Sequence, residues 1–169
     1  MVMISFDYNG NLTPYSLISL RLTDVFNHFV SDFPQSTTRP VLYNHFLAYI
    51  NDLTYILDQS IHQWLGGSFI SSKVDPNDVD CVNLIVFNES REKSIDLLIP
   101  YLLIGGSRDT YFVDGHLIAI YPSTDERYEA ITLPSINYWQ AFLMKDRQDN
   151  PRGIVELIDA DYDARTSST

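Results

Sequence analysis

The chain has 169 residues, of which 45% are apolar, and it carries 22 acidic against 11 basic residues, for a formal net charge of −11. A chain of this length and apolar content can bury the core of one ordinary globular domain. The negative charge argues against nonspecific binding to nucleic acid, which requires Lys and Arg to neutralise phosphates, and the basic residues are scattered along the sequence. A small metal–nucleotide complex or a basic partner protein fits this charge better.

Cysteine content and hydropathy exclude several classes of protein. Cys81 is the single cysteine, so an intramolecular disulfide and a cysteine-based zinc site are both excluded. The amino terminus lacks the basic start and long apolar stretch of a signal peptide. The longest apolar run, Leu97 to Ile104, contains Pro100 and is too short to span a bilayer. These features predict a soluble, cytoplasmic protein that does not associate with membranes.

The first part of the chain predicts an extended arm followed by two helices. Residues 1–20 include the helix-breaking Pro14, so we expect an extended arm. A first helix is expected over 23–33, and a second runs from the cap residue Thr38 to about Gln59. The second helix has apolar residues at steps of four, four, three and four, which form one stripe that should cover a sheet. These residues are Leu42, Phe46, Ile50, Leu53 and Leu57.

The rest of the chain predicts strands alternating with helices. The pattern first indicates strands over 61–65 and 78–87, followed by a helix from Asn88 or Ser90 to about 102. Next it indicates a hairpin of strands 110–113 and 116–121. A helix from Pro134 and a strand over 154–158 complete the predicted elements. The hairpin prediction rests on Asp114-Gly115, a strong signal for a two-residue turn. Residues 1–160 are therefore interpreted as one domain, and the polar residues 161–169 as a disordered tail.

The segment from Trp64 to Phe87 carries the residues that point to chemistry. Asp78 and Asp80 are two positions apart, so in a strand their carboxylates project from one face, with Cys81 in the core on the other. Two adjacent carboxylates repel each other unless a cation lies between them, and a hard divalent ion such as Mg²⁺ prefers oxygen ligands. Gly66–Ser68 is expected to open a short helix, whose free N–H groups suit a phosphate. The alternative is an ordinary strand–loop–strand whose two aspartates are simply solvated.

The glycine–serine pair at 67–68 followed by Asp78-x-Asp80, with apolar residues on both flanks, resembles the nucleotidyltransferase fold of the DNA polymerase β superfamily. The wider stretch 66–80 is similar to a family of small, uncharacterised bacterial proteins with this fold. Those proteins also tend to carry three further segments, here Gly10-Asn11-Leu12, Asp146-Arg147 and Arg152-Gly153-Ile154-Val155. The resemblance implies an α/β (α+β) domain with the minimal nucleotidyltransferase fold, a short mixed sheet flanked by helices.

The same resemblance implies roles for five residues. Asp78 and Asp80 would be the catalytic residues and the ligands of Mg²⁺ or Mn²⁺. Gly67, Ser68 and Lys73 would bind a nucleoside triphosphate as substrate, with Lys73 acting as a point charge on the phosphate oxygens. Judged from the residues alone, Ser68 could instead cap a helix without any ligand, and Lys73 could be a solvated loop residue.

One expected feature of the superfamily is missing from the predicted elements. A third carboxylate on a neighbouring strand usually completes the site, but the predicted strand 116–121 has no acid, and Ala119 occupies about the expected place. Asp114 is interpreted as a turn residue, and Asp125 and Glu126 lie beyond the strand. The missing acid predicts nucleotide binding with slow or partner-dependent transfer.

Two main functions follow from these observations. The first is an enzyme that transfers a nucleotide from a triphosphate to a protein or RNA acceptor, in a toxin–antitoxin or phage-defence pair as the resemblance implies. The second is a nucleotidyltransferase-fold module with little or no turnover that acts by protein contact, for example as an antitoxin. The motif at 67–80 favours the enzyme, whereas the missing acid and the negative charge favour the module. A nucleotide sensor without transfer is a third, weaker alternative.

Overall fold

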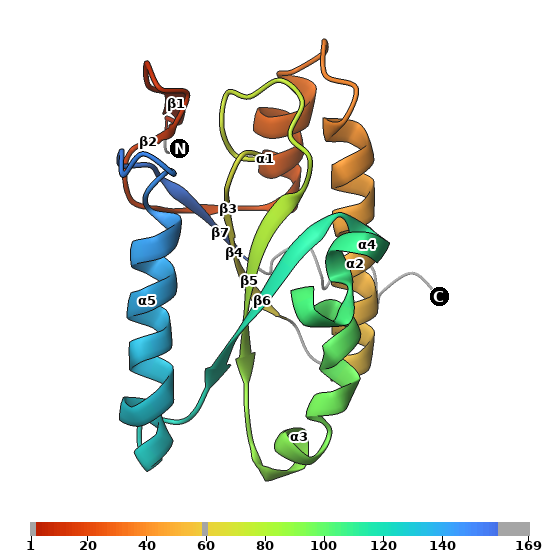
Figure 1. Ribbon diagram of the computed structural model, residues 1–169, viewed down its shortest axis with the longest axis vertical. Helices are drawn as coiled ribbons and strands as arrows, with labels where there is room; N and C mark the ends of the chain where they lie inside the picture. Colours follow the sequence, from red (N-terminus) through yellow and green to blue (C-terminus); the bar gives the residue numbers. More distant parts are fainter. Residues whose placement is uncertain (1–2, 59–60, 159–169) are drawn as a thin grey trace.

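A five-stranded mixed sheet forms the centre of the protein, with its strands in the order β3–β7–β4–β5–β6 (Figure 1). The computed structural model describes residues 3–58 and 61–158. The strands of this sheet are β3 (Leu17–Leu20), β7 (Ile154–Leu157), β4 (His62–Gly66), β5 (Val79–Val86) and β6 (Val113–Ile120). The pairs β3–β7 and β5–β6 are parallel, whereas β7–β4 and β4–β5 are antiparallel. A separate hairpin consists of β1 (Ser5–Phe6) and β2 (Leu12–Thr13).

Helices cover both faces of the sheet, which confirms the expected mixed α/β class with a short mixed sheet flanked by helices. Figure 1 shows α5 (Leu133–Leu143) on one face, and α1 (Leu22–Phe26) and α2 (Arg39–Leu57) on the other. The remaining helical elements are α3 (Glu89–Lys93), α4 (Ser107–Tyr111), π-helical segments at Asn27–Ser31 and Tyr128–Thr132, and 3-10 segments at Ile95–Tyr101 and Leu103–Gly105. No helix within the described ranges is long and apolar enough to cross a lipid bilayer.

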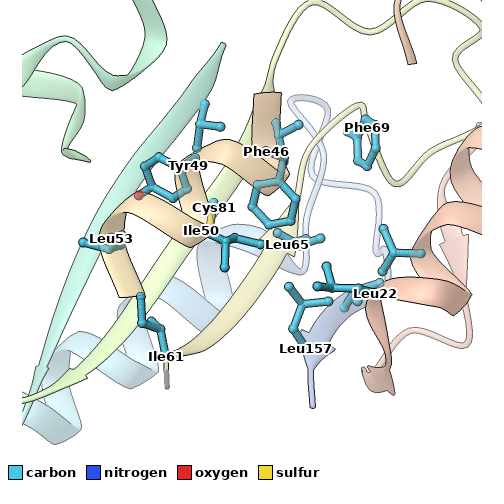
Figure 2. Close-up of a cluster of buried hydrophobic side chains, with 14 of the residues drawn as sticks. Leu22, Phe46, Tyr49, Ile50, Leu53, Ile61, Leu65, Phe69, Cys81 and Leu157 are labelled. Atoms are coloured by element: carbon cyan, nitrogen blue, oxygen red, sulfur yellow. The ribbon is translucent and has the colours of Figure 1, made fainter. Parts of the chain in front are cut away.

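The main core lies between α2 and the sheet. All five residues of the predicted apolar stripe on α2 are buried, so this prediction is confirmed. Figure 2 shows side chains of α2, Phe46 and Ile50 among them, packed against Leu65 of β4 and Cys81 of β5. Cys81 is fully buried, as expected for a core residue. Since each large apolar side chain contributes about 1.5–3 kcal/mol when fully buried, this core holds β4 and β5 firmly in place. The helix ends at Leu57, and its expected end at residue 59 lies outside the described residues.

The opposite face of β5 packs against α5, because successive side chains of a strand point to opposite faces. Cys81 belongs to the α2 core, whereas Val82 belongs to a second apolar cluster that includes Leu143 of α5. Asp80 lies two residues before Val82 and therefore projects towards the α5 side, at the beginning of β5. This alternation determines on which side of the sheet a site built on Asp80 can lie.

The hairpin predicted around Asp114-Gly115 is wrong. Residues 113–120 form the single strand β6, which runs parallel to β5, and residues 107–111 form α4. Gly115 does not have a positive φ; instead, a Cβ at this position would lie 2.4 Å from the carbonyl oxygen of Tyr101. The glycine is therefore required by a close approach of the backbone inside a strand, not by a turn.

Two other predictions are correct only in part. The amino-terminal arm is not merely extended, because Leu17–Leu20 pairs with β7 as the edge strand β3. The helix expected after β5 begins with Asn88 as its cap, whose Oδ1 accepts a hydrogen bond from the N–H of Arg91 at 2.9 Å. It ends at Lys93 and is followed by two 3-10 segments, the first of which includes Pro100. The tail expected at 161–169 lies outside the described residues.

Candidate functional site

One cleft gathers the residues of the central motif with charged residues from distant parts of the chain. Its volume is about 740 Å³, and it lies where β4 ends and β5 begins. Gly67, Ser68, Lys73, Asp78 and Asp80 all line it. Five of the 11 basic residues of the chain also line it: Lys73, Arg108, Lys145, Arg147 and Arg152. The basic residues that are scattered in the sequence are thus concentrated here by the fold.

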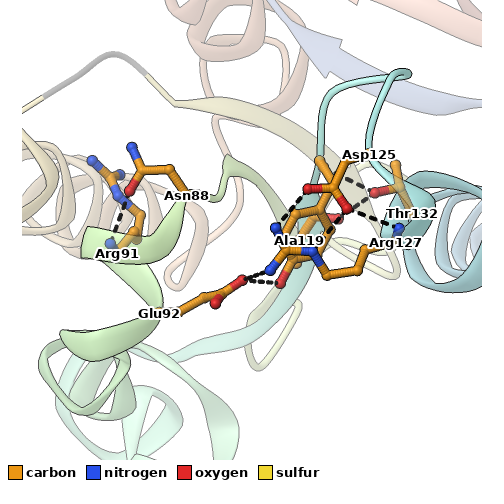
Figure 3. Close-up of polar contacts among 8 residues, drawn as sticks. Asn88, Arg91, Glu92, Ala119, Asp125, Arg127 and Thr132 are labelled. Carbon is orange, nitrogen blue, oxygen red and sulfur yellow. Dashed lines mark hydrogen bonds and ion pairs between the residues drawn. The ribbon is translucent and has the colours of Figure 1, made fainter.

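The cleft contains a third carboxylate beside Asp80, and it belongs to Asp114. The parallel register of β5 and β6 pairs Asp80 with Asp114, and residues paired in register project from the same face. Ala119 instead pairs with Ile85 towards the other end of β6, where its carbonyl oxygen accepts a hydrogen bond from Thr132 Oγ1 at 2.8 Å (Figure 3). The prediction that Ala119 takes the place of a third acid is wrong, because the strand begins three residues earlier than expected and runs parallel to β5.

The other two acids considered, Asp125 and Glu126, do not line the cleft. Asp125 accepts hydrogen bonds from Arg127 Nη2 at 2.5 Å and Nε at 2.8 Å, and Arg127 also pairs with Glu92 at 2.5 Å (Figure 3). The hydrogen bonds from Arg127 lower the pKa of Asp125. This network lies beside Ala119, at the end of the strand away from Asp114.

Burial and repulsion from neighbouring carboxylates raise the pKa values of two residues of the cleft, Asp80 and Asp114. Burial, followed by the charges of Asp78 and Asp114, raises the pKa of Asp80 to about 6. Burial and the charge of Asp78 also raise the pKa of Asp114. Moreover, Oδ1 of Asp114 is buried and accepts no hydrogen bond from the described residues. Crowded carboxylates with unused lone pairs favour the binding of a cation.

The cation that contacts these carboxylates in the structure is Arg108 of α4. Its Nη2 lies 2.6 Å from Asp78 Oδ2, and its Nε lies 3.4 Å from Asp114 Oδ1. As the side chains stand, no three Asp, Glu, His or Cys residues of the described ranges are arranged to hold a metal ion. The donor chemistry of three carboxylates nevertheless fits Mg²⁺ or Mn²⁺, which prefer hard oxygen ligands. A metal ion at this position would compete with Arg108 for Asp78 and Asp114.

Gly67 lies directly against the carboxylate of Asp80. Its φ is +65°, and a Cβ at this position would lie 1.5 Å from Asp80 Oδ2. Residues 67–70 form a turn, so the prediction of a short helix opened by the glycines is wrong. The carbonyl oxygen of Ser68 closes this turn by accepting hydrogen bonds from the N–H and the Oγ of Ser71, at 3.2 and 2.8 Å. Ser68 is therefore part of a turn beside the carboxylates and not a helix cap.

A buried arginine fixes the loop that joins this turn to the aspartates. The side chain of Arg39 is fully buried and donates hydrogen bonds to five backbone carbonyl groups, those of Phe29, Phe69, Ser71, Lys73 and Val74. At the next position, Asp75 Oδ1 accepts hydrogen bonds from the backbone N–H groups of Thr37 and Thr38, at 2.8 and 3.3 Å. The loop is thus attached to the amino-terminal end of α2, and its shape does not depend on a ligand.

The segments singled out near both ends of the sequence meet at this cleft. Asn11 Nδ2 donates hydrogen bonds to Asp146 Oδ2 at 3.0 Å and to the carbonyl oxygen of Pro151 at 3.3 Å. The N–H of Gly153 donates to the carbonyl oxygen of Leu12 at 2.6 Å. Figure 1 shows the β1–β2 hairpin beside the start of β7. The amino-terminal hairpin therefore holds the loop 145–152 in place at the rim of the cleft.

Comparison with known proteins places this chain in a family. The model of DUF6932, described as a family of unknown function, matches residues 4–158. The chain belongs to the DUF6932 family. No curated protein and no solved structure matches the chain significantly. The matched range includes every residue that lines the cleft.

Sequence reasoning missed two functional candidates in this DUF6932 protein, Asp114 and Arg108. Asp114 was assigned to a turn because Asp-Gly is a strong local signal. The mostly apolar run that follows it to Ile120, unbroken by proline, was the signal for one long strand. Arg108 follows Gly105-Gly106 in a segment without periodicity, so only its spatial position beside Asp78 reveals it.

Replacing Gly67 by Ala should disrupt the cleft of this DUF6932 protein. The methyl group would collide with the Asp80 carboxylate, and together with the strain of a positive φ we expect a loss of about 2–4 kcal/mol in the free energy of unfolding. Gly106→Ala is the matched control, because Gly106 also has a positive φ but open space around the Cβ position, and it should cost only about 1–2 kcal/mol. Urea unfolding measures both values, and equal losses would contradict the close contact.

Proposed function

We propose that this chain is a metal-dependent nucleotidyltransferase, which binds a nucleoside triphosphate and transfers a nucleotide to an acceptor. The observation that carries the proposal is the pairing of Asp80 with Asp114 in the β5–β6 register, with Gly67 against the Asp80 carboxylate. Asp78 and Lys73 line the same cleft. The resemblance implies this constellation of a glycine turn and three carboxylates, of which Asp80 and Asp114 lie on adjacent strands and Asp78 immediately precedes β5. Such a site suits a triphosphate with its metal.

The residues of the cleft divide into metal ligands and phosphate-binding groups. Asp78, Asp80 and Asp114 would hold Mg²⁺ or Mn²⁺, which supplies neutralisation of the charge on the triphosphate. The turn at Gly67-Ser68 would offer backbone N–H groups to the phosphates, and Lys73 would add a positive charge.

In the proposed reaction an acceptor hydroxyl oxygen bonds to the α-phosphorus, the bond between this phosphorus and the bridging oxygen to the β-phosphate breaks, and pyrophosphate leaves. The hydroxyl proton must pass to a base. Oδ1 of Asp114 is suited to accept it, since this atom is buried and accepts no hydrogen bond from the described residues. For this to occur, Arg108 Nε, 3.4 Å away, must leave its place beside Asp114.

Arg108 also supports a second candidate function. Because Arg108 contacts both Asp78 and Asp114, the carboxylates are already partly neutralised without a metal. This favours the alternative of a nucleotidyltransferase-fold module without turnover, which acts by binding a partner protein such as the toxin of a toxin–antitoxin pair. The two functions differ in their response to metal, since only the enzyme requires Mg²⁺ to displace Arg108.

The deciding experiment is incubation of the purified protein with Mg²⁺ or Mn²⁺ and each of the four labelled nucleoside triphosphates. The reactions should be run with and without the protein encoded by the neighbouring gene, and with total RNA as a second acceptor. Metal-dependent transfer of label to protein or RNA, with release of pyrophosphate, would support the enzyme. Stable binding of the neighbouring protein without any transfer would support the module instead.

Asp80→Asn should remove the stabilisation that Mg²⁺ gives to the protein. A ligand at 100 times its dissociation constant stabilises the folded state by about 2.7 kcal/mol, so the wild type should melt at a higher temperature in excess Mg²⁺, and the variant should not. Asp149→Asn is the control, because Asp149 is an exposed acid of the same cleft with a positive φ that Asn tolerates. Thermal melting of all three proteins with and without Mg²⁺ is the measurement, and an undiminished response of Asp80→Asn would exclude Asp80 as a ligand.

Without metal, Asp80→Asn should stabilise the protein in a pH-dependent manner. The pKa of Asp80 in the folded protein, about 6, lies above its ordinary value of 3.8, so the folded state binds this proton more tightly than the unfolded state. The stability that Asp80 contributes is therefore complete below its ordinary pKa and is lost as the pH rises through about 6. Urea unfolding should show the variant to be more stable than the wild type by roughly 1–3 kcal/mol at about pH 8, and by less at about pH 5.

A further inference from the structure

The five basic residues of the cleft differ in their exposure and in the ion pairs that their side chains already make. Arg108 pairs with Asp78 and Asp114, and the exposed Lys145 pairs with Asp149 at 3.2 Å. Lys73 and Arg147 are exposed, so binding a ligand would require their long side chains to be ordered. Arg152 is half-buried and makes no ion pair with any residue that the structure describes.

Arg152 is held in a fixed position by the end of α5 and by its neighbour in the chain. Its Nε donates a hydrogen bond to the carbonyl oxygen of Leu143 at 2.6 Å, and its backbone N–H donates to that of Met144 at 2.9 Å. The backbone is closely packed at the next residue, Gly153, where a Cβ would lie 2.5 Å from the carbonyl oxygen of Pro14. The two terminal nitrogens of the guanidinium group make no hydrogen bond with the described residues, although Arg152 lines the cleft.

The loop that precedes Arg152 is organised around the partly buried carboxylate of Asp146 and not around a ligand. Asp146 accepts hydrogen bonds from the backbone N–H groups of Gln148 and Asn150, and from the side chain of Asn11 in the amino-terminal hairpin. These hydrogen bonds lower the pKa of Asp146, those from the side chains of Asn150 and Asn11 foremost. The loop is therefore fixed before any substrate arrives, and Arg152 keeps its place in the cleft, where its charge interacts with that of Asp80.

We propose that Arg152 binds the phosphate chain of the nucleotide substrate, an inference that rests on the function proposed above. An arginine whose Nε is fixed to a carbonyl oxygen still presents N–H groups of its planar fork, which match the geometry of phosphate oxygens. Preorganisation removes the cost of ordering a long side chain at the moment of binding. Arg152 thus places one fixed positive charge in the same cleft as the proposed metal ligands, within the electrostatic reach of Asp80, where a metal-bound triphosphate would lie.

A purely structural role for Arg152 predicts a different result. In that case the guanidinium group would only cap the carboxy-terminal end of α5 and balance the charge of Asp80. Its removal would then lower stability and strengthen the binding of Mg²⁺ to the carboxylates, but it would not affect a ligand's phosphates. The two roles are therefore distinguished by measuring the affinity for Mg²⁺ and the affinity for a phosphate chain in separate titrations.

The test is isothermal titration calorimetry on the full chain with three probes: Mg²⁺ alone, inorganic tripolyphosphate with Mg²⁺, and each nucleoside triphosphate with Mg²⁺. Arg152→Gln should weaken the binding of tripolyphosphate and of the preferred nucleotide about 10- to 100-fold, as expected for loss of a charge-assisted hydrogen bond. It should leave Mg²⁺ binding unchanged or tighter. Arg152→Lys, which keeps the charge but loses the fork, should give an intermediate loss.

Arg91→Gln is the matched control. Arg91 is also half-buried and also donates a hydrogen bond to a backbone carbonyl, that of Leu57 at 3.0 Å, but it lies outside the cleft. This variant should bind all three probes as the wild type does, and circular dichroism should show that both glutamine variants are folded at the temperature used. If Arg152→Gln binds tripolyphosphate within about twofold of the wild type, the inference is overturned and the proposed function stands. If the wild type binds Mg²⁺ but neither tripolyphosphate nor any nucleotide, the proposed function and the inference both fail.

Discussion

Asp114→Asn should reduce nucleotide transfer by about 100-fold or more, because it removes one of three carboxylates that would hold the metal. Asp114 is paired with Asp80 in the β5–β6 register and has a buried Oδ1 without a hydrogen bond. Asn is isosteric, so the fold should persist, and the loss of one negative charge should relieve the repulsion that acts on Asp80. The rate of label transfer under single-turnover conditions, at saturating Mg²⁺, measures the effect on the chemical step.

Two variants at other positions of the same region serve as controls for Asp114. Asp125→Asn changes an acid beside the far end of β6, in the network with Arg127, and should transfer at a rate within about threefold of the wild type. Ala119→Asp should gain nothing, because residue 119 is paired with Ile85 and lies away from Asp80. Full activity of Asp114→Asn would exclude Asp114 as a required metal ligand. Increased activity of Ala119→Asp would contradict the register on which the proposed site depends.

Arg39→Met should destabilise the protein by roughly 3–5 kcal/mol, the largest effect on stability that we expect from a single substitution away from the carboxylates. The guanidinium group is fully buried and satisfies five carbonyl groups, most of them in the segment 69–74. It also lies over the ring of Phe33, with 3.9 Å from Cζ to the ring centroid. Methionine fills much of the volume but leaves these carbonyl oxygens buried without partners, so the loop should lose its shape.

Urea unfolding measures the loss, and Arg147→Met is its control, since Arg147 is an exposed arginine without a hydrogen bond from its side chain to the described residues. The control should change the free energy of unfolding by no more than about 0.5 kcal/mol. Arg39→Lys should fall between the two, because one ammonium group cannot reach carbonyl groups spread over the whole loop. A loss below about 1 kcal/mol for Arg39→Met would show that water replaces the guanidinium group and that the loop is held in another way.

The sequence by itself determined the elements whose signals are local and periodic. The apolar stripe of α2 and the buried strand after Asp78 were predicted because burial on one face imposes a period of 3.6 on a helix and a long apolar run on a central strand. The same reasoning placed Cys81 in the core and Asp80 on the opposite face of its strand. These inferences need no knowledge of which strand lies beside which.

The tertiary structure alone decided which residues face Asp78 and Asp80. Asp114 became a neighbour of Asp80 only because β6 pairs parallel to β5, and strand order and direction depend on contacts between residues far apart in the sequence. The same holds for Arg108 and Arg152, which come from α4 and from the segment before β7. The Asp-Gly signal at 114–115 was misleading because a glycine can serve a tight turn or a close approach of another backbone, and the sequence does not distinguish these two uses.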